Sequence, residues 1–225
     1  MSINKKVDME DKISKSAFCE DSRVKFPTLM HLMGMGFNYV SLKGLKTKYV
    51  STPKTEFDPL TNILTGYFTE AYGKLNPDSE SGEAEKMLAK IQSSLMNDDL
   101  GRQFYNEILL NTGERIIDLS SPANFYKNNT FQVATEMTCG DKDSDNYRPD
   151  ITLFVNGLPL AFIEVKKENN HKGIQAETER MKQRFINPKY RRFLNLTQIM
   201  VFSNDMEYDS NEVTPTIGAF YATIG

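Results

Sequence analysis

The sequence predicts an α/β fold of the α+β kind, in which helices precede a mixed sheet. Apolar residues recur at helical spacing up to about residue 110, and the period then changes to two. A helical segment at 173–185 separates the last two predicted strands, so the core from residue 130 onward has the order βββαβ. The chain has 225 residues, enough for one large domain or two small ones.

Four helices are predicted in the first half of the chain, over residues 24–37, 62–75, 83–95 and 100–110. The clearest is 83–95, where Met87, Leu88, Ile91 and Leu95 form an apolar stripe. Residues 1–20 show no periodicity, so we expect a flexible arm there. We expect a helical part over 21–112 to pack on a core formed by 113–225.

Five strands are predicted in the second half, over residues 115–119, 130–138, 151–155, 160–165 and 197–203. The third and fourth are joined by Asn156-Gly157-Leu158-Pro159, a strong hairpin signal.

Composition excludes several classes of protein. The segment at the N-terminus is polar, and no run of 18 apolar residues exists, so neither a signal peptide nor a membrane span is predicted. Two cysteines cannot form a disulfide framework and two histidines cannot form a multi-histidine metal site. We therefore expect a cytoplasmic protein. The net charge is −3, but residues 166–192 hold nine basic and three acidic side chains. This basic stripe is either a phosphate-facing surface or a solvated helix face.

The candidate catalytic residues are Asp150, Glu164 and Lys166. Asp150 opens one strand of the hairpin, and Glu164 and Lys166 are two residues apart on the other, so their side chains leave the same face. Two carboxylates and a lysine that converge there would form an oxygen site for Mg²⁺ beside an ammonium group. That combination suits phosphodiester hydrolysis. Spacing alone equally supports a surface hairpin with an ion pair between Glu164 and Lys166.

The hairpin allows a geometric test. A regular two-residue turn at Asn156-Gly157 would set Asp150 opposite Ile163 and send Glu164 to the other face. An odd-length loop pairs Asp150 with Glu164 instead. The nuclease hypothesis therefore predicts an odd-length loop or a bulge in this hairpin.

These segments resemble a known family. Arg148-Pro149-Asp150-Ile151, then Val155-Asn156-Gly157-Leu158-Pro159-Leu160, then Ile163-Glu164-Val165-Lys166-Lys167 resemble the PD-(D/E)xK nuclease motif, and more narrowly the N-terminal domain of the R subunit of type I restriction–modification enzymes. The segments 119–125 and 131–133 resemble what precedes the motif there.

The resemblance implies a restriction-endonuclease-like fold and a DNA endonuclease. Asp150 and Glu164 would be Mg²⁺ ligands, with Mn²⁺ as a substitute, and Lys166 the catalytic lysine. The family's subunit continues into ATP-hydrolysing motor domains. This chain has no GxxxxGK[ST] loop, so we expect a fragment of a larger subunit, with ATP used outside it. The implied partners are double-stranded DNA and the methylation and specificity subunits, with no membrane. The domain itself would cut without sequence specificity.

Several residues stay secondary candidates. Glu136 is a possible additional acid, with an exposed strand carboxylate as the alternative, and Glu20 is either a further acid or a helix cap. Candidate contacts to the DNA backbone are Lys167, Lys172, Arg180 and Arg184. The Gln-x-x-x-Tyr helix motif of related nucleases is absent, because Gln175 and Gln183 are not followed by tyrosine at that spacing. The alternative functions are a non-catalytic DNA-docking or assembly domain of the same fold, and a stand-alone nuclease.

Overall fold

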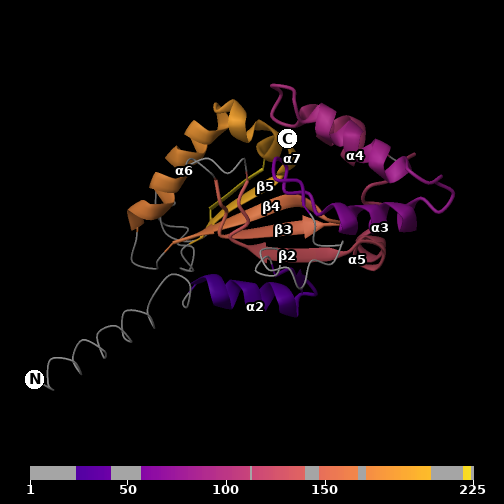
Figure 1. Cartoon of the computed structure of the whole chain (residues 1–225). Coiled ribbons are helices and arrows are strands. Elements are labelled where there is room, and N and C mark those ends of the chain that lie inside the picture. Colours follow the sequence, from indigo (N-terminus) through magenta and orange to yellow (C-terminus); the bar gives the residue numbers. More distant parts are fainter. Residues whose placement is uncertain are drawn as a thin grey trace, which may run out of the picture.

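A six-stranded mixed sheet forms the centre of the molecule (Figure 1). The computed structural model describes residues 24–41, 57–111, 113–139, 147–166, 171–203 and 220–223. The strands lie in sequence order across the sheet: β1 (Asn38–Tyr39), β2 (Phe131–Thr135), β3 (Ile151–Val155), β4 (Leu158–Val165), β5 (Ile199–Ser203) and β6 (Phe220–Thr223). The pairs β1–β2 and β4–β5 are parallel and the other pairs are antiparallel. The predicted α/β class is confirmed, with a restriction-endonuclease-like mixed core.

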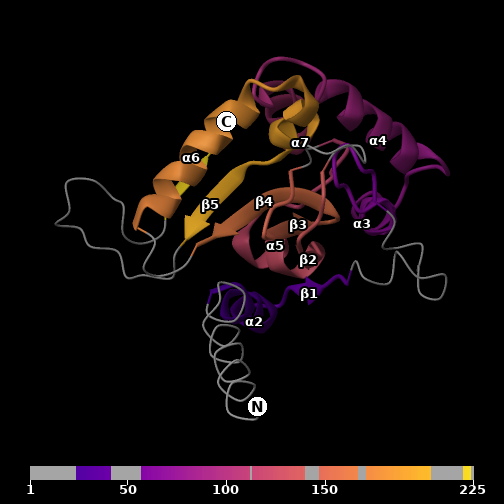
Figure 2. The ribbon, with the colours of Figure 1, turned by 60° about the vertical axis from the view of Figure 1, so that its left-hand side comes forward.

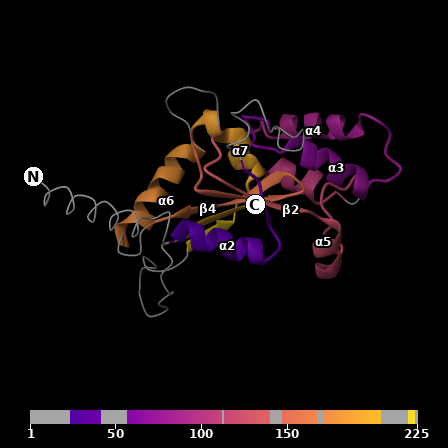
Figure 3. The same ribbon diagram turned by 60° about the horizontal axis from the view of Figure 1, so that its bottom comes forward.

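Helices cover both faces of the sheet (Figure 3). α2 (Phe26–Gly34) lies on one face, where Leu32 packs with Ile151 and Ile163. On the other face, Met181 of α6 (His171–Phe185) and Phe193 of α7 (Arg191–Leu196) pack with side chains of β4 and β5. Figure 2 shows α6 and α7 on this face, with α2 on the opposite side. The remaining helices are α3 (Thr65–Leu75), α4 (Glu83–Ser94), η4 (Phe104–Leu109), α5 (Pro122–Asn128) and η5 (Pro188–Tyr190).

The turn between β3 and β4 is fixed by its backbone and by its neighbours. Asn156 has φ 53° and Gly157 has φ 77°, as a two-residue turn of the hairpin type requires. A Cβ on Gly157 would meet the Leu64 carbonyl oxygen at 2.5 Å, so only glycine fits. The buried Asn156 amide donates to the Ile116 carbonyl and to Asn129 Oδ1. The hairpin is therefore anchored at its closed end.

The predicted strand at 115–119 is wrong. The segment forms no ladder, although Ile116 and Ile117 are buried as a strand pattern suggests. Its backbone instead bonds to side-chain amides: Arg115 N–H donates to Asn76 Oδ1, and Asp118 N–H donates to Asn129 Oδ1. Because these partners satisfy the backbone, two buried isoleucines pack with the helices without a neighbouring strand.

Other boundaries shift by a few residues. The helix predicted over 62–75 begins at Thr65, because Asn62 has φ 60° and the preceding turn is closed by the Asp58 carboxylate, which accepts from Leu60 N–H. The strand predicted over 130–138 ends at Thr135, where Glu136 turns to φ 55°. The arm predicted over 1–20 lies outside the described residues. Among the helices that the structure describes, none could cross a bilayer.

Candidate nuclease site

The β3–β4 hairpin contains the bulge that the nuclease hypothesis predicts. Near the turn, Val155 pairs with Leu158 and Phe154 with Pro159, as in a regular two-residue hairpin. The register then shifts, so that Leu153 pairs with Ala161 and Ile151 with Ile163. Leu160 is thus the extra residue on β4. Continued by one residue, this register sets Asp150 opposite Glu164 on the face that α6 covers.

The carboxyl group of Asp150 lies near that of Glu164, close enough for the negative charge of Asp150 to raise the pKa of Glu164. The Asp150 carboxylate is held by the backbone of β4, because its Oδ2 accepts from the Val165 backbone N–H at 2.9 Å. Glu164 is only 5% exposed, whereas the Asp150 side chain is 24% exposed. One acid of the pair is therefore buried and the other faces the opening of the site.

Burial, followed by the nearby negative charge of Asp150, raises the pKa of Glu164 to about 8. Two carboxylates in contact cannot both ionise cheaply unless a cation lies with them. The pair therefore either shares a proton or takes up positive charge.

Tyr147 positions the buried acid, and sequence reasoning missed it. Its hydroxyl donates to Glu164 Oε1 at 2.8 Å. Burial raises the pKa of Tyr147 well above the usual range. The ring packs edge-on against Phe162 and Phe193, and the Arg184 guanidinium lies 4.1 Å from the ring centroid. Only the position of Tyr147, three residues before Asp150, could have suggested this role from the sequence.

Lys166 follows the last residue of β4 and turns toward α6. Its backbone N–H donates to the Ser203 carbonyl, which continues the pairing with β5. The Lys166 Nζ lies 3.6 Å from Glu177 Oε2 and donates to the Val165 carbonyl at 3.1 Å. Glu177, on α6, is 3% exposed and also pairs with Arg180 at 2.9 Å and with Arg184 at 3.0 Å.

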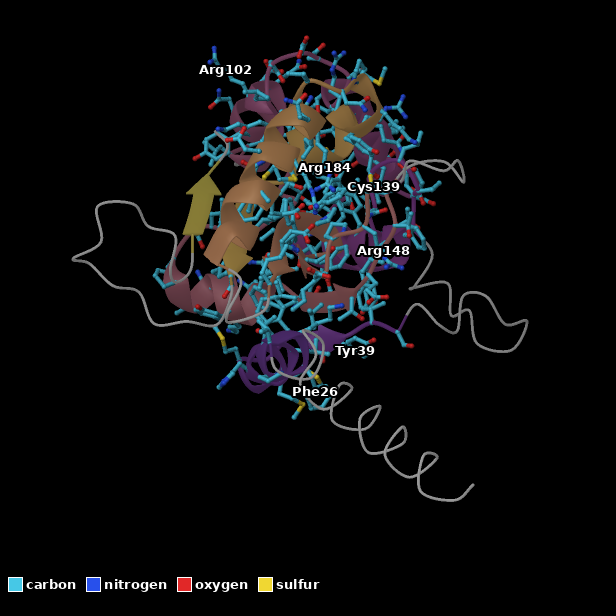
Figure 4. The ribbon with its side chains drawn as sticks, turned by 90° about the vertical axis from the view of Figure 1, so that its left-hand side faces the viewer. Phe26, Tyr39, Arg102, Cys139, Arg148 and Arg184 are labelled. Carbon is cyan, nitrogen blue, oxygen red and sulfur yellow. The ribbon has the colours of Figure 1, made fainter. Side chains whose placement is uncertain are left out.

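The open side of the site carries Glu136, Lys25 and Arg148. Lys25, next to the first residue of α2, places its Nζ 2.9 Å from Glu136 Oε1 and 3.4 Å from Asp150 Oδ1. Arg148 Nη1 lies 3.7 Å from Glu136 Oε2. Glu136 therefore reaches the acid pair through the ammonium of Lys25. Figure 4 faces this end of the sheet, with Arg184 on the α6 side and Arg148 between it and α2.

The basic residues predicted to contact DNA have different environments. The Arg180 side chain is 66% exposed, while that of Arg184 is 25% exposed because it packs on Tyr147. Gln183 is exposed on α6, in agreement with a surface position. Lys167 and Glu20, and the side chains of Lys172 and Gln175, lie outside the described residues.

Asp150 and Glu164 are the pair that could hold a metal ion. Their oxygens are hard donors, and their mutual repulsion would be relieved by a small divalent cation. Within the described ranges, no group of three or more His, Cys, Asp or Glu side chains converges on one point, so water or phosphate oxygens would complete the coordination. Burial of Glu164 and the partial exposure of the Asp150 side chain suit such an ion.

Comparison with known proteins points to the same family as the motif. No curated protein matches the chain significantly. A sequence model of the family described as "Type I restriction enzyme R protein N terminus" matches residues 18–214, which is most of the chain and includes every side chain of the site. The chain belongs to the family of N-terminal domains of type I restriction enzyme R proteins.

Proposed function

We propose that this chain is a Mg²⁺-dependent endonuclease domain that hydrolyses DNA phosphodiester bonds within a type I restriction complex. The observation that supports it most is the bulge at Leu160, because the register after it, continued one residue beyond Ile151 and Ile163, sets Asp150 opposite Glu164. A regular hairpin would have separated these acids by the thickness of the sheet. A family match alone would not distinguish a nuclease from a docking domain of the same fold.

In this proposal each group of the site has a defined role. Asp150 and Glu164 hold Mg²⁺, and Tyr147 keeps the Glu164 carboxylate in place through its hydroxyl. When bound, the metal polarises a phosphoryl oxygen and lowers the pKa of a coordinated water. Lys166, on the same face, orients the attacking water or offsets the charge that develops on the phosphate. Mn²⁺, with the same preference for oxygen, substitutes for Mg²⁺.

DNA reaches the site from the rest of the complex. The exposed Arg180 on α6 is a candidate phosphate contact, and it shares the carboxylate of Glu177 with Lys166. The remaining phosphate footprint, ATP-driven translocation and sequence recognition would come from motor domains and from the specificity and methylation subunits. We therefore expect little cleavage by this chain alone.

Cleavage by the assembled complex tests the proposal. Glu164→Ala and Asp150→Asn should each lower the cleavage rate by about 1,000-fold or more, because the metal supplies several kcal/mol of transition-state stabilisation. DNA binding by the complex should be unchanged. Glu85→Ala, on the exposed side of α4, is the matched control and should cleave normally. Normal cleavage by Glu164→Ala would refute the proposal.

Calorimetry of metal binding separates catalysis from docking. The 225-residue chain should bind Mn²⁺ or Mg²⁺ at one pair of acids, and Asp150→Asn should abolish the binding. If neither ion binds to the wild-type chain or to the assembled complex, the domain is a non-catalytic docking module and the endonuclease proposal fails.

A further inference from the structure

One buried carboxylate beside the site has no role in the proposed hydrolysis. Glu177 lies on α6, is 3% exposed, and is the shared acid for three cationic side chains, Lys166, Arg180 and Arg184. A buried carboxylate is costly unless it is paired. A single partner would satisfy that requirement, so three partners indicate that Glu177 organises the cations around it.

The contacts of Glu177 lead to both catalytic groups of β4. One path is direct, from Glu177 Oε2 to Lys166 Nζ at 3.6 Å. The other runs from Glu177 Oε1 to Arg184 at 3.0 Å, from Arg184 to the Tyr147 ring at 4.1 Å, and from the Tyr147 hydroxyl to Glu164 at 2.8 Å. Because Glu164 and Lys166 are two residues apart, the contacts close into a ring.

We infer that Glu177 is a positioning residue for the nuclease site, which holds Lys166 on the face of the acid pair and keeps Arg184 against Tyr147. This inference rests on the proposed function. Lys166 has four rotatable side-chain bonds, and Glu177 is the one acid among the described residues that forms an ion pair with its Nζ, so Glu177 limits where the ammonium can go. Small displacements of a reacting group are expensive in rate. Glu177 itself thus acts on catalysis by positioning Lys166, without contacting the substrate.

A second glutamate on α6 offers a matched control. Glu179 forms an i,i+3 pair with Lys182 at 2.6 Å, just as Glu177 pairs with Arg180. Its side chain is 68% exposed, and its ion pair is with Lys182, a residue that is 62% exposed at the side chain. Glu179→Gln therefore removes the same charge and the same kind of helical pair while leaving Lys166 held.

Chemical labelling of lysine tests the contact without relying on activity. In the 225-residue chain, acetylation of Lys166 measured by mass spectrometry should rise several-fold in Glu177→Gln and stay at the wild-type level in Glu179→Gln. Glu177→Asp keeps the charge but withdraws the carboxylate, so it should also free Lys166 if Glu177→Gln folds poorly. Unchanged labelling in both Glu177 variants would overturn the inference.

Cleavage by the assembled complex tests the consequence. Glu177→Gln should lower the single-turnover cleavage rate by about 10- to 100-fold, with DNA affinity unchanged. If Glu177→Gln loses cleavage and loses DNA affinity or folded protein to the same extent, then Glu177 only stabilises the fold. That result overturns the inference. Normal cleavage by Glu177→Gln, with Glu164→Ala inactive, overturns the inference alone. Normal cleavage by Glu164→Ala as well shows that the proposed function has failed.

Discussion

The two acids of the site occupy different surroundings. Glu164 is 5% exposed and is held by Tyr147 against the aromatic cluster beneath α6. Asp150 is 24% exposed and is approached by Lys25, from a helix on the other face of the sheet. The buried half of the site, Glu164 and Tyr147, is held by packing, whereas the open half, Asp150 with Lys25 and Glu136, is held by ion pairs and by the Val165 backbone N–H. Packing therefore fixes Glu164, while Asp150 stays partly exposed to solvent.

The largest effect should come from removing the charge of the buried acid. With metal chelated, Glu164 binds its proton more tightly in the folded chain, where its pKa is about 8, than in the unfolded chain, where the ordinary value is 4.5. The stabilisation is fully present below about pH 4.5 and is lost as pH rises through 8. Glu164→Gln should remove this loss, on the order of a few kcal/mol.

Denaturant unfolding in a chelator at pH 5, 7 and 9 measures this effect. Glu85→Gln, an exposed acid on α4, should keep the wild-type dependence. If Glu164→Gln and wild type lose stability in parallel between pH 5 and 9, the acids do not repel as the contact implies.

Tyr147→Phe should weaken the buried half alone. Removing the hydroxyl leaves Glu164 without that donor in a buried place, so we expect the free energy of unfolding to fall by about 1–2 kcal/mol. Because this hydrogen bond lowers the pKa of Glu164, Mn²⁺ binding at pH 7 should weaken several-fold and recover at higher pH. Calorimetry and urea unfolding check both. Tyr126→Phe, at a 70% exposed tyrosine, is the control and should be neutral.

Lys25→Met should act on the open half in the opposite direction. Its ammonium partly neutralises Asp150 and Glu136, and a metal ion must compete with it. We expect Mn²⁺ affinity to rise about fivefold and the metal-free chain to lose about 1 kcal/mol of stability. Lys90→Met breaks the ion pair with Glu114, at the protein surface, and should leave affinity unchanged. Weaker metal binding in Lys25→Met would show that Lys25 supports the ion instead of competing with it.

Arg148→Gln should have the smallest effect. The Arg148 side chain is 58% exposed and lies 3.7 Å from a Glu136 that is 45% exposed. Exposed pairs of this kind contribute little, so the free energy of unfolding should change by less than about 0.5 kcal/mol. A change above about 1 kcal/mol in thermal unfolding would mean that the open half is as tightly built as the buried one.

Much of the fold follows from local patterns. The helix over 83–95 was predictable from its apolar stripe, and the structure places it at Glu83–Ser94. The hairpin was predictable from Asn156-Gly157 and the two apolar runs beside it. The segment 115–119 was not, because buried isoleucines show that a chain enters the core but not whether its backbone finds a strand or side-chain amides as partners.

The supporting residues of the site could not be predicted in the same way. Tyr147 and Glu177 lie 17 and 13 residues from Glu164, and no motif links them to it. Tyr147 reaches Glu164 across the sheet, and Glu177 reaches Lys166 because α6 packs back over β4 and β5. Such contacts between residues far apart in the sequence depend on how helices and strands pack together. The spacing of residues along the chain does not predict that packing.

The amino-acid sequence by itself determined the fold class, the identity of the acid, acid and lysine set, and the condition that the hairpin be irregular. Only the tertiary structure decided where the irregularity falls. With the bulge at Leu160, Phe162 packs against Tyr147, Phe193 and Phe202. These three side chains come from segments that are distant from one another in the sequence. Burial of that aromatic cluster sets the register, and the register brings Glu164 to Asp150.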